Sequence, residues 1–257
     1  MIGTIIQARM GSSRLPGKVM KIVDNKNPMI SYVIDQVKNS KKIEKIIVAT
    51  SNLHEDDEIE KFVKSQNVLC YRGNSKDVLD RYYNCAKKFG LKSIVRISGD
   101  CPLIEPQIID KVIEKFILED YDYVSNNNPR SFPYGMDLEV FSFNVLESVF
   151  NNAKLPSERE HVTPYIYNNP KKFKIGKLQN DVNYSNIRLT VDRELDFKLI
   201  QMVISKINKK PILLGDIINL YNNERKIFEI NQKYVTDEGY LKSLKEDSEF
   251  MKQKFLT

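Results

Sequence analysis

The chain has 257 residues, 41% hydrophobic and 29% charged, an ordinary composition for a globular protein with one sizeable core. Its net charge is +6, but basic and acidic residues are interleaved, so we expect a small anionic ligand and no nucleic acid partner. No run approaches the roughly 20 apolar residues of a membrane helix, and the N-terminus lacks a signal-peptide pattern, which favours a cytoplasmic protein without a membrane partner.

The first half of the sequence alternates strand and helix patterns. Apolar runs predict strands at 3–8, 45–50, 68–71 and 93–98, and helical spacing predicts helices at 28–38, 55–65, 77–89 and 106–118. This alternation predicts an α/β fold with a Rossmann-like mixed, mostly parallel sheet and helices on both faces. Because ligands bind beyond the carboxyl ends of such strands, chemistry is expected after Ala8, Thr50 and Ser98.

The second half is less regular. We expect a loop at 125–135, strands at 137–143, near 173–175 and at 187–191, and helices at 144–153, 157–167 and 196–207. Two further helical segments follow residue 216, with a turn at 238–240 between them. The predicted organisation is a nucleotide-binding domain over 1–215, with an inserted lobe at about 125–190 and a helical C-terminal extension over 216–257. The three cysteines are widely spaced and predict free thiols, not a disulfide or zinc site.

The strongest chemical signal follows the first strand. Residues 7–18 hold Arg9, Arg14 and Lys18 together with two serines and two glycines. Glycines let a backbone approach an anion closely, and arginine forks match phosphate oxygens, so this loop predicts a triphosphate cradle. It is neither a P-loop nor a dinucleotide fingerprint. The alternative is a basic surface turn.

The run IIQARMGSSRLPGKVM at 5–20 closely resembles the N-terminal signature of the CMP-sugar synthetase family, which includes CMP-KDO and CMP-sialic acid synthetases. The SpsF-like branch of spore-coat polysaccharide proteins is the nearest match. The resemblance implies a nucleotide-diphospho-sugar transferase fold and a cytidylyltransferase that uses CTP and Mg²⁺. It places Arg9, Arg14 and Lys18 on the triphosphate. The nucleotide-binding residues it implies are Gln7, Ala8, Arg9, Gly11, Ser12, Ser13, Arg14, Lys18, Arg72, Asp77, Arg81, Ser98 and Gly99. For 72–81, the alternative is an ordinary capped helix.

Two acidic residues at predicted strand ends are the candidate metal ligands. Asp100 follows the strand at 93–98, beside a glycine, and Asp192 ends the apolar run at 189–191. A carboxylate at such an edge can bind a hard cation, and the family resemblance assigns Mg²⁺ to both. We therefore expect Arg9, Lys18 and Asp100 to be catalytic. The alternative for Asp100 is capping the next helix, and Asp196 is expected to cap the helix that follows Asp192.

Two polar segments, 133–139 and 156–164, are the candidate acceptor site. Both match the SpsF-like pattern, but the acceptor signatures of CMP-KDO and CMP-sialate synthetases are missing, so the acceptor stays open. His161 is either a base, an acceptor contact or a structural residue. The candidate acceptor-binding residues are Tyr134, Gly135, Asp137, Glu139, Glu160 and His161.

The resulting functional prediction is transfer of CMP from CTP to an acidic sugar or a related carboxylated or phosphorylated metabolite, with release of pyrophosphate, for surface polysaccharide biosynthesis. The alternative is a nucleotide-sugar-dependent glycosyltransferase of the same fold. Such enzymes usually hold their metal with a D-x-D, whereas the D-Y-D at 120–122 follows a helix. The dense phosphate-binding groups oppose a non-catalytic module. Members of the resembled family dimerise through the inserted lobe, so the resemblance implies a homodimer.

Overall fold

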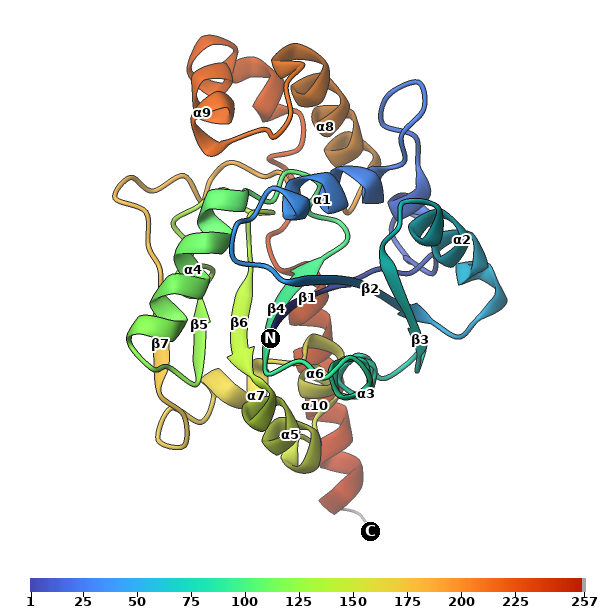
Figure 1. Cartoon of the computed structure of the whole chain (residues 1–257), viewed down its shortest axis with the longest axis vertical. Helices are drawn as coiled ribbons and strands as arrows, with labels where there is room; N and C mark the ends of the chain where they lie inside the picture. The colour runs from blue at the N-terminus through green and yellow to red at the C-terminus, as the bar shows by residue number, and fades with distance from the viewer. Residues whose placement is uncertain (256–257) are drawn as a thin grey trace.

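A seven-stranded sheet forms the centre of the molecule, in the order β3-β2-β1-β4-β6-β5-β7 (Figure 1). The computed structural model describes residues 1–255, and the side chains of residues 1–253. Its strands are β1 (Ile2–Gln7), β2 (Lys45–Ser51), β3 (Leu69–Gly73), β4 (Ser93–Ser98), β5 (Tyr123–Ser125), β6 (Glu139–Ser142) and β7 (Ile175–Lys177). Only β6 runs antiparallel to its neighbours, which confirms the mixed, mostly parallel α/β fold.

Helices cover both faces of this sheet (Figure 1). They are α1 (Met29–Lys38), α2 (Asp57–Ser65), α3 (Val78–Lys88), α4 (Pro106–Leu118), α5 (Phe143–Asn152), α6 (Pro156–His161), α7 (Pro164–Tyr167), α8 (Glu194–Ile207), α9 (Leu214–Asn223) and α10 (Glu238–Phe255), with short 3-10 turns at Lys18–Met20, His54–Asp56 and Arg225–Glu229. Successive strand residues point to opposite faces, so Ile6 packs with α1, α4 and α8 while Ile5 packs with α3 and α5. Within the described residues, no helix is both long and apolar enough to cross a membrane.

The predicted strand at 187–191 is wrong. The segment is extended and its apolar residues are buried, but it joins the sheet nowhere. Both neighbouring positions of β4 are taken by β1 and β6, so the segment cannot pair beside that strand. Instead it crosses the carboxyl end of the sheet, where the Tyr134 carbonyl accepts from Leu189 N at 2.6 Å and the Asp100 carbonyl accepts from Val191 N at 2.9 Å.

Four smaller observations concern the second half. The turn expected at 238–240 is the first turn of α10, and the short strand β5 has no counterpart in the prediction. The helix expected at 157–167 is two helices, because Val162 has a positive φ of 71°. The segment at 125–190 also supplies β6 and β7 to the central sheet, so its strands belong to the same layer as β1 to β4.

Candidate active site

A polar cleft of about 870 Å³ lies beyond the carboxyl ends of β1 and β4, where the parallel-sheet rule places ligands. The loop after β1, the turn after β4, the crossing segment at 190–192, helices α6 and α7 and the start of α10 all line it. Segments from both ends of the chain therefore meet at one site. The site residues predicted from the sequence that line the cleft are Gln7, Ala8, Arg9, Ser12, Ser13, Arg14, Lys18, Arg81, Ser98, Asp100, Tyr134, Asp137, Glu139, Glu160, His161 and Asp192.

Lys18 stands at the centre of the charged groups in this cleft. Its Nζ lies 2.7 Å from Asp100 Oδ2 and 3.0 Å from Asp192 Oδ1, and donates to the Val191 carbonyl at 2.7 Å. Burial alone would lower the pKa of Lys18, but the charges of Asp100 and Asp192 outweigh it and raise the pKa above its usual value. Lys18 is therefore a cation at neutral pH, held between the two carboxylates.

Asp192 is surrounded by three cationic side chains. Besides Lys18, Arg14 Nη2 lies 2.5 Å from its Oδ1, and Arg188 Nη2 lies 3.2 Å from its Oδ2. Burial alone would raise the pKa of Asp192, but Lys18 and Arg14 lower it to about 2. Asp196 caps α8 as expected, accepting from the backbone N of Asp192 and of Arg193 at 3.0 Å each. Asp192 is therefore ionised at any pH at which the protein would work.

Asp100 does not cap the helix that follows it. Glu105 fills that position at the start of α4, accepting from Gln107 N at 3.3 Å and Ile108 N at 3.2 Å. The Asp100 carboxylate is left to face Lys18 across the cleft. The helix-cap alternative for Asp100 is therefore wrong, and its carboxylate pairs with Lys18 instead.

Asp100 and Asp192 form a donor pair that suits Mg²⁺. Their oxygens converge on one ammonium group, so a cation already sits between them. Within the described residues, no group of three or more His, Cys, Asp or Glu side chains forms a metal cage. Mg²⁺ commonly takes one or two carboxylates and completes its shell with water and substrate phosphates, so two carboxylates are enough for it.

Arg81 is a buried cation with free hydrogen-bonding capacity. It is 2% exposed, lines the cleft, and has no partner for Nε or Nη1 among the described residues. Burial and the nearby Arg9 lower the pKa of Arg81. An unpartnered buried guanidinium is costly, so the geometry favours an anion at this position. Arg9 itself pairs with Glu160, Nη2 to Oε1, at 3.0 Å.

Arg72 does not reach the cleft, which corrects the sequence prediction. Its guanidinium contacts Asp57 Oδ1 at 2.7 Å and Glu60 Oε2 at 2.8 Å, and donates to the Ser51 carbonyl at 2.5 Å. These partners join β3 to the start of α2. The donors that would contact a nucleotide are already used, so the side chain has a structural role.

Four other candidates also lie outside the cleft lining: Gly11, Asp77, Gly99 and Gly135. Asp77 caps α3, accepting from Asp80 N at 2.9 Å, and pairs with Arg159, as the capped-helix alternative predicts. Gly135 has a φ of 109°, and a Cβ there would lie 2.4 Å from Thr190 N. Its observed role is to let two backbones approach, and the residue does not line the cleft.

The acceptor candidates that do line the cleft are held by other side chains. Asp137 Oδ2 lies 2.9 Å from Arg130 Nη2, and Glu139 Oε2 lies 2.5 Å from Arg96 Nη1. His161 Nε2 lies 3.0 Å from Ser243 Oγ. Burial, aided by the charge of Arg96, lowers the pKa of His161 to about 4, so its ring is neutral at pH 7.

Sequence reasoning missed several charged residues that line the cleft, and also Arg188, which contacts Asp192 without lining the cleft. Arg96 and Arg188 each interrupt an apolar run, which is a signal that a buried cation has a partner. Arg130, Arg159 and the cleft-lining residues of α10 carry no comparable signal, because only the fold brings them to the site.

The D-Y-D sequence at 120–122 lies far from this site in the sheet. It directly precedes β5, which runs parallel to β4, so it occupies the opposite edge from Asp100. Asp122 Oδ2 accepts from Lys174 N at 2.8 Å, a structural contact with the residue before β7. This placement opposes the glycosyltransferase alternative.

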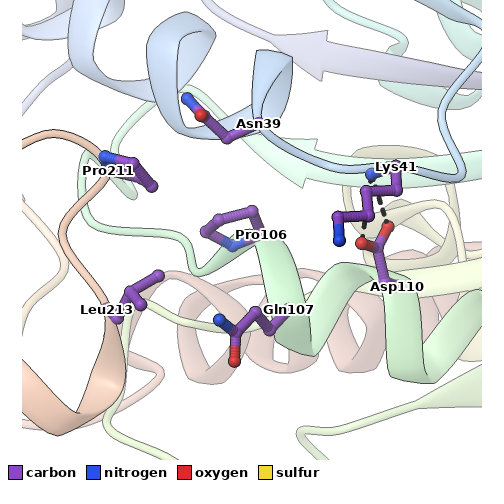
Figure 2. Close-up of a pocket in the computed structure, with 7 residues that line it drawn as sticks. All are labelled: Asn39, Lys41, Pro106, Gln107, Asp110, Pro211 and Leu213. Atoms are coloured by element: carbon purple, nitrogen blue, oxygen red, sulfur yellow. Dashed lines mark hydrogen bonds between the residues drawn. The ribbon is translucent and has the colours of Figure 1, made fainter.

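A second hollow, of about 270 Å³, lies between α1, α4 and the loop at 211–213 (Figure 2). Lys41 and Asp110 are the charged residues among those that line it. The Asp110 carboxylate accepts from Lys41 N at 3.0 and 3.1 Å, as the dashed lines in Figure 2 show. None of the predicted site residues lies there, so the polar cleft is the candidate active site.

Comparison with known proteins agrees with this geometry. The sequence model of the cytidylyltransferase family matches residues 4–238. The chain belongs to the cytidylyltransferase family. Its enzymes are nucleotidyltransferases, and nucleotidyl transfer is therefore the activity of this family member.

Individual relatives cover nearly the whole chain. An uncharacterized protein of Methanocaldococcus jannaschii is 40% identical over 88% of this chain and 93% of its own length. The spore coat polysaccharide biosynthesis protein SpsF of Bacillus subtilis is 31% identical over 85% of this chain and 92% of its own length. The solved structure of a cytidylyltransferase from Leptospira borgpetersenii is 33% identical, with a TM-score of 0.85 over 91% of this chain and 98% of its own.

Proposed function

We propose that this cytidylyltransferase family member transfers CMP from CTP to an acidic sugar or a related carboxylated or phosphorylated metabolite, with Mg²⁺, in cytoplasmic synthesis of surface polysaccharide. The observation that carries the proposal is the contact of Lys18 with Asp100 and Asp192. Lys18 is the last residue of the loop at 7–18, which is rich in phosphate-binding groups. The acidic acceptor rests on the resemblance to CMP-sugar synthetases and on the buried, unpartnered Arg81.

Binding of the triphosphate would exchange the ion pairs of the cleft. Arg14 and Lys18 now neutralise Asp192 at 2.5 and 3.0 Å, and phosphate oxygens are better partners for both cations. As these cations turn to phosphate, the carboxylates of Asp100 and Asp192 become free to hold Mg²⁺. When bound, Mg²⁺ supplies positive charge to the phosphate oxygens.

The transfer step needs one bond to form and one to break. An acceptor oxygen attacks the α-phosphorus, and the bond from that phosphorus to the oxygen shared with the β-phosphate breaks, so pyrophosphate leaves with the bonding electrons. Arg14 and Lys18 stabilise the charge that develops on the leaving pyrophosphate. His161, neutral at pH 7, would form a hydrogen bond with the acceptor.

The test is pyrophosphate release with each of the four ribonucleoside triphosphates, Mg²⁺ and a panel of sugar acids and sugar phosphates. Release with CTP that depends on one panel member and is lost in Asp100→Asn supports the proposal. Arg72→Ala is the matched control, because Arg72 lies outside the cleft. Turnover of a nucleotide-sugar without pyrophosphate release would contradict it.

A further inference from the structure

Arg188 contacts Asp192 from within the protein and does not line the cleft. The residue is buried, with 7% of its surface exposed. Its Nη2 donates to Asp192 Oδ2 at 3.2 Å, whereas Arg14 and Lys18 contact the other oxygen, Oδ1, at 2.5 and 3.0 Å. The two oxygens of this carboxylate therefore have different partners: Oδ1 meets cations that line the cleft, and Oδ2 meets the buried arginine.

A second carboxylate holds the guanidinium of Arg188 in place. Arg188 Nε donates to Asp196 Oδ1 at 2.8 Å, and Nη2 donates to Asp196 Oδ2 at 3.1 Å, a two-point contact with a defined geometry. Asp196 is 1% exposed and also accepts from the backbone N of Asp192 at 3.0 Å. One arginine thus bridges the acidic side chains at the two ends of the 192–196 turn and fixes their relative positions.

Residues from distant parts of the chain complete this arrangement. Asn231, which is fully buried, donates through Nδ2 to the Arg188 carbonyl at 3.1 Å and to Asp196 Oδ1 at 2.8 Å. The rings of Tyr134 and Tyr234 have their centroids 5.1 and 5.9 Å from the guanidinium carbon of Arg188, within the range of a cation–π contact. Hydrogen bonds and aromatic rings therefore restrict the movement of Arg188.

The contact between Arg188 and Asp196 decides what Arg188 contributes to Asp192. Asp196 balances the guanidinium charge at 2.8 Å, so the charge of Asp192 remains for the groups that meet it in the cleft. Arg188 therefore acts on Asp192 chiefly as a hydrogen-bond donor that orients the carboxylate. Donors that orient a metal-binding carboxylate in this way contribute to the affinity of the metal, although they do not touch it.

We propose that Arg188 is a positioning residue that presents Asp192 to the metal through Oδ1 alone and so favours Mg²⁺ over Ca²⁺. The inference rests on the proposed function, in which Asp192 binds Mg²⁺, and adds to it the residue that selects the ion. Mg²⁺ needs a near-ideal octahedral shell, whereas Ca²⁺ accepts both oxygens of one carboxylate in a flexible shell. Because Arg188 holds Oδ2, a contact through both oxygens of Asp192 would have to break that hydrogen bond.

The experiment compares Arg188→Met and Arg188→Lys with Val203→Ala. Methionine removes the donor, and lysine keeps the positive charge but lacks the rigid fork that bridges two carboxylates. Val203 is fully buried in α8, toward the far end of that helix from Asp192, so its truncation lowers stability without altering the contacts of Asp192. Each full-length protein is titrated calorimetrically with CTP in EDTA, in Mg²⁺ and in Ca²⁺ at equal concentrations, below its unfolding transition.

We expect both Arg188 variants to raise the Kd of CTP in Mg²⁺ by about tenfold or more, because Asp192 is no longer oriented. In Ca²⁺ the Kd should change by less than about threefold, because the freed Oδ2 can join Oδ1 on the larger ion. Val203→Ala should keep the wild-type Kd in both metals. Arg188→Lys decides the question if Arg188→Met does not fold.

Two kinds of result would count against these ideas, and they are distinguishable. An equal change of the Kd in both metals, or wild-type values in Arg188→Lys, would overturn the inference and leave the proposed function intact. Wild-type protein that binds CTP equally in EDTA and in Mg²⁺, or that does not bind CTP, would refute the proposed function, and the inference would fall with it.

Discussion

Replacing Lys18 by methionine should destabilise the free protein and make it respond to Mg²⁺. The side chain of Lys18 is 10% exposed and neutralises two carboxylates. Removing one partner from a buried ion pair costs about 3–5 kcal/mol. Here Arg14 and Arg188 remain on Asp192, and the Asp100 side chain is 22% exposed, so we expect a smaller loss than that, about 2–3 kcal/mol.

The assay is thermal unfolding without nucleotide, with and without Mg²⁺. The expected loss corresponds to a fall in Tm of about 4–12 °C for a protein of this size. In Lys18→Met the two carboxylates lose the ammonium between them, so Mg²⁺ can bind there without nucleotide. At 100 times its Kd, Mg²⁺ would restore about 2.7 kcal/mol. Wild type should respond far less, because Lys18 already lies between the two carboxylates.

The control is Lys21→Met, in the same region of the chain. Lys21 pairs with Glu194 at 3.3 Å, and both side chains are substantially exposed, so its loss should cost less than about 1 kcal/mol and create no Mg²⁺ response. If Lys18→Met unfolds like wild type, or if Mg²⁺ raises the Tm of both equally, the view that Lys18 takes the place of a metal ion is refuted.

Three further predictions follow from the charges of the cleft. Arg81→Met should raise the unfolding free energy by about 1–3 kcal/mol, because it removes a buried unpaired charge, while CTP or acceptor affinity falls at least tenfold; a less stable variant with normal affinities would contradict this. His161→Gln should flatten the fall in stability between pH 6.5 and 4, measured by urea unfolding. The pKa of His161 is lowered from 6.5 to about 4 on folding, so its contribution is present above 6.5 and lost as the pH falls. Asp192→Asn should likewise reduce acid sensitivity between pH 3.8 and about 2, the interval over which the lowered pKa of Asp192 makes stability depend on ionisation.

The parallel half of the fold was predictable from sequence because its elements are long and regular. The apolar run Ser93–Ser98 and the helical spacing of Pro106–Leu118 appear in the structure with the predicted bounds. Because the carboxyl ends of parallel strands lie on the same side of a sheet, the residues after β1 and β4 were correctly expected to lie together. The run at 187–191 also has a strand-like pattern. Such a pattern does not show whether other strands already occupy the neighbouring positions in the sheet.

The candidate site was predictable where the chemistry is local to a motif. Arg14 and Lys18 lie in one loop after β1, and their meeting with Asp100 follows from strand ends on the same side of the sheet. Asp192 joins them from the crossing segment at 187–191, which is not a strand. Arg72 was misplaced because a sequence does not show that Asp57 and Glu60 occupy its guanidinium. The contribution of α10 was not predictable, since an amphipathic helix near a chain end carries no sign of what its polar face meets.

The most direct test of the central claim is phosphorus NMR of the reaction of the full-length protein with CTP, Mg²⁺ and an acidic sugar that supports pyrophosphate release. Transfer of CMP predicts a new phosphodiester resonance that grows in equal amount with pyrophosphate, and no reaction in Asp100→Asn. Release of inorganic phosphate or of free CMP without a phosphodiester product would contradict cytidylyl transfer.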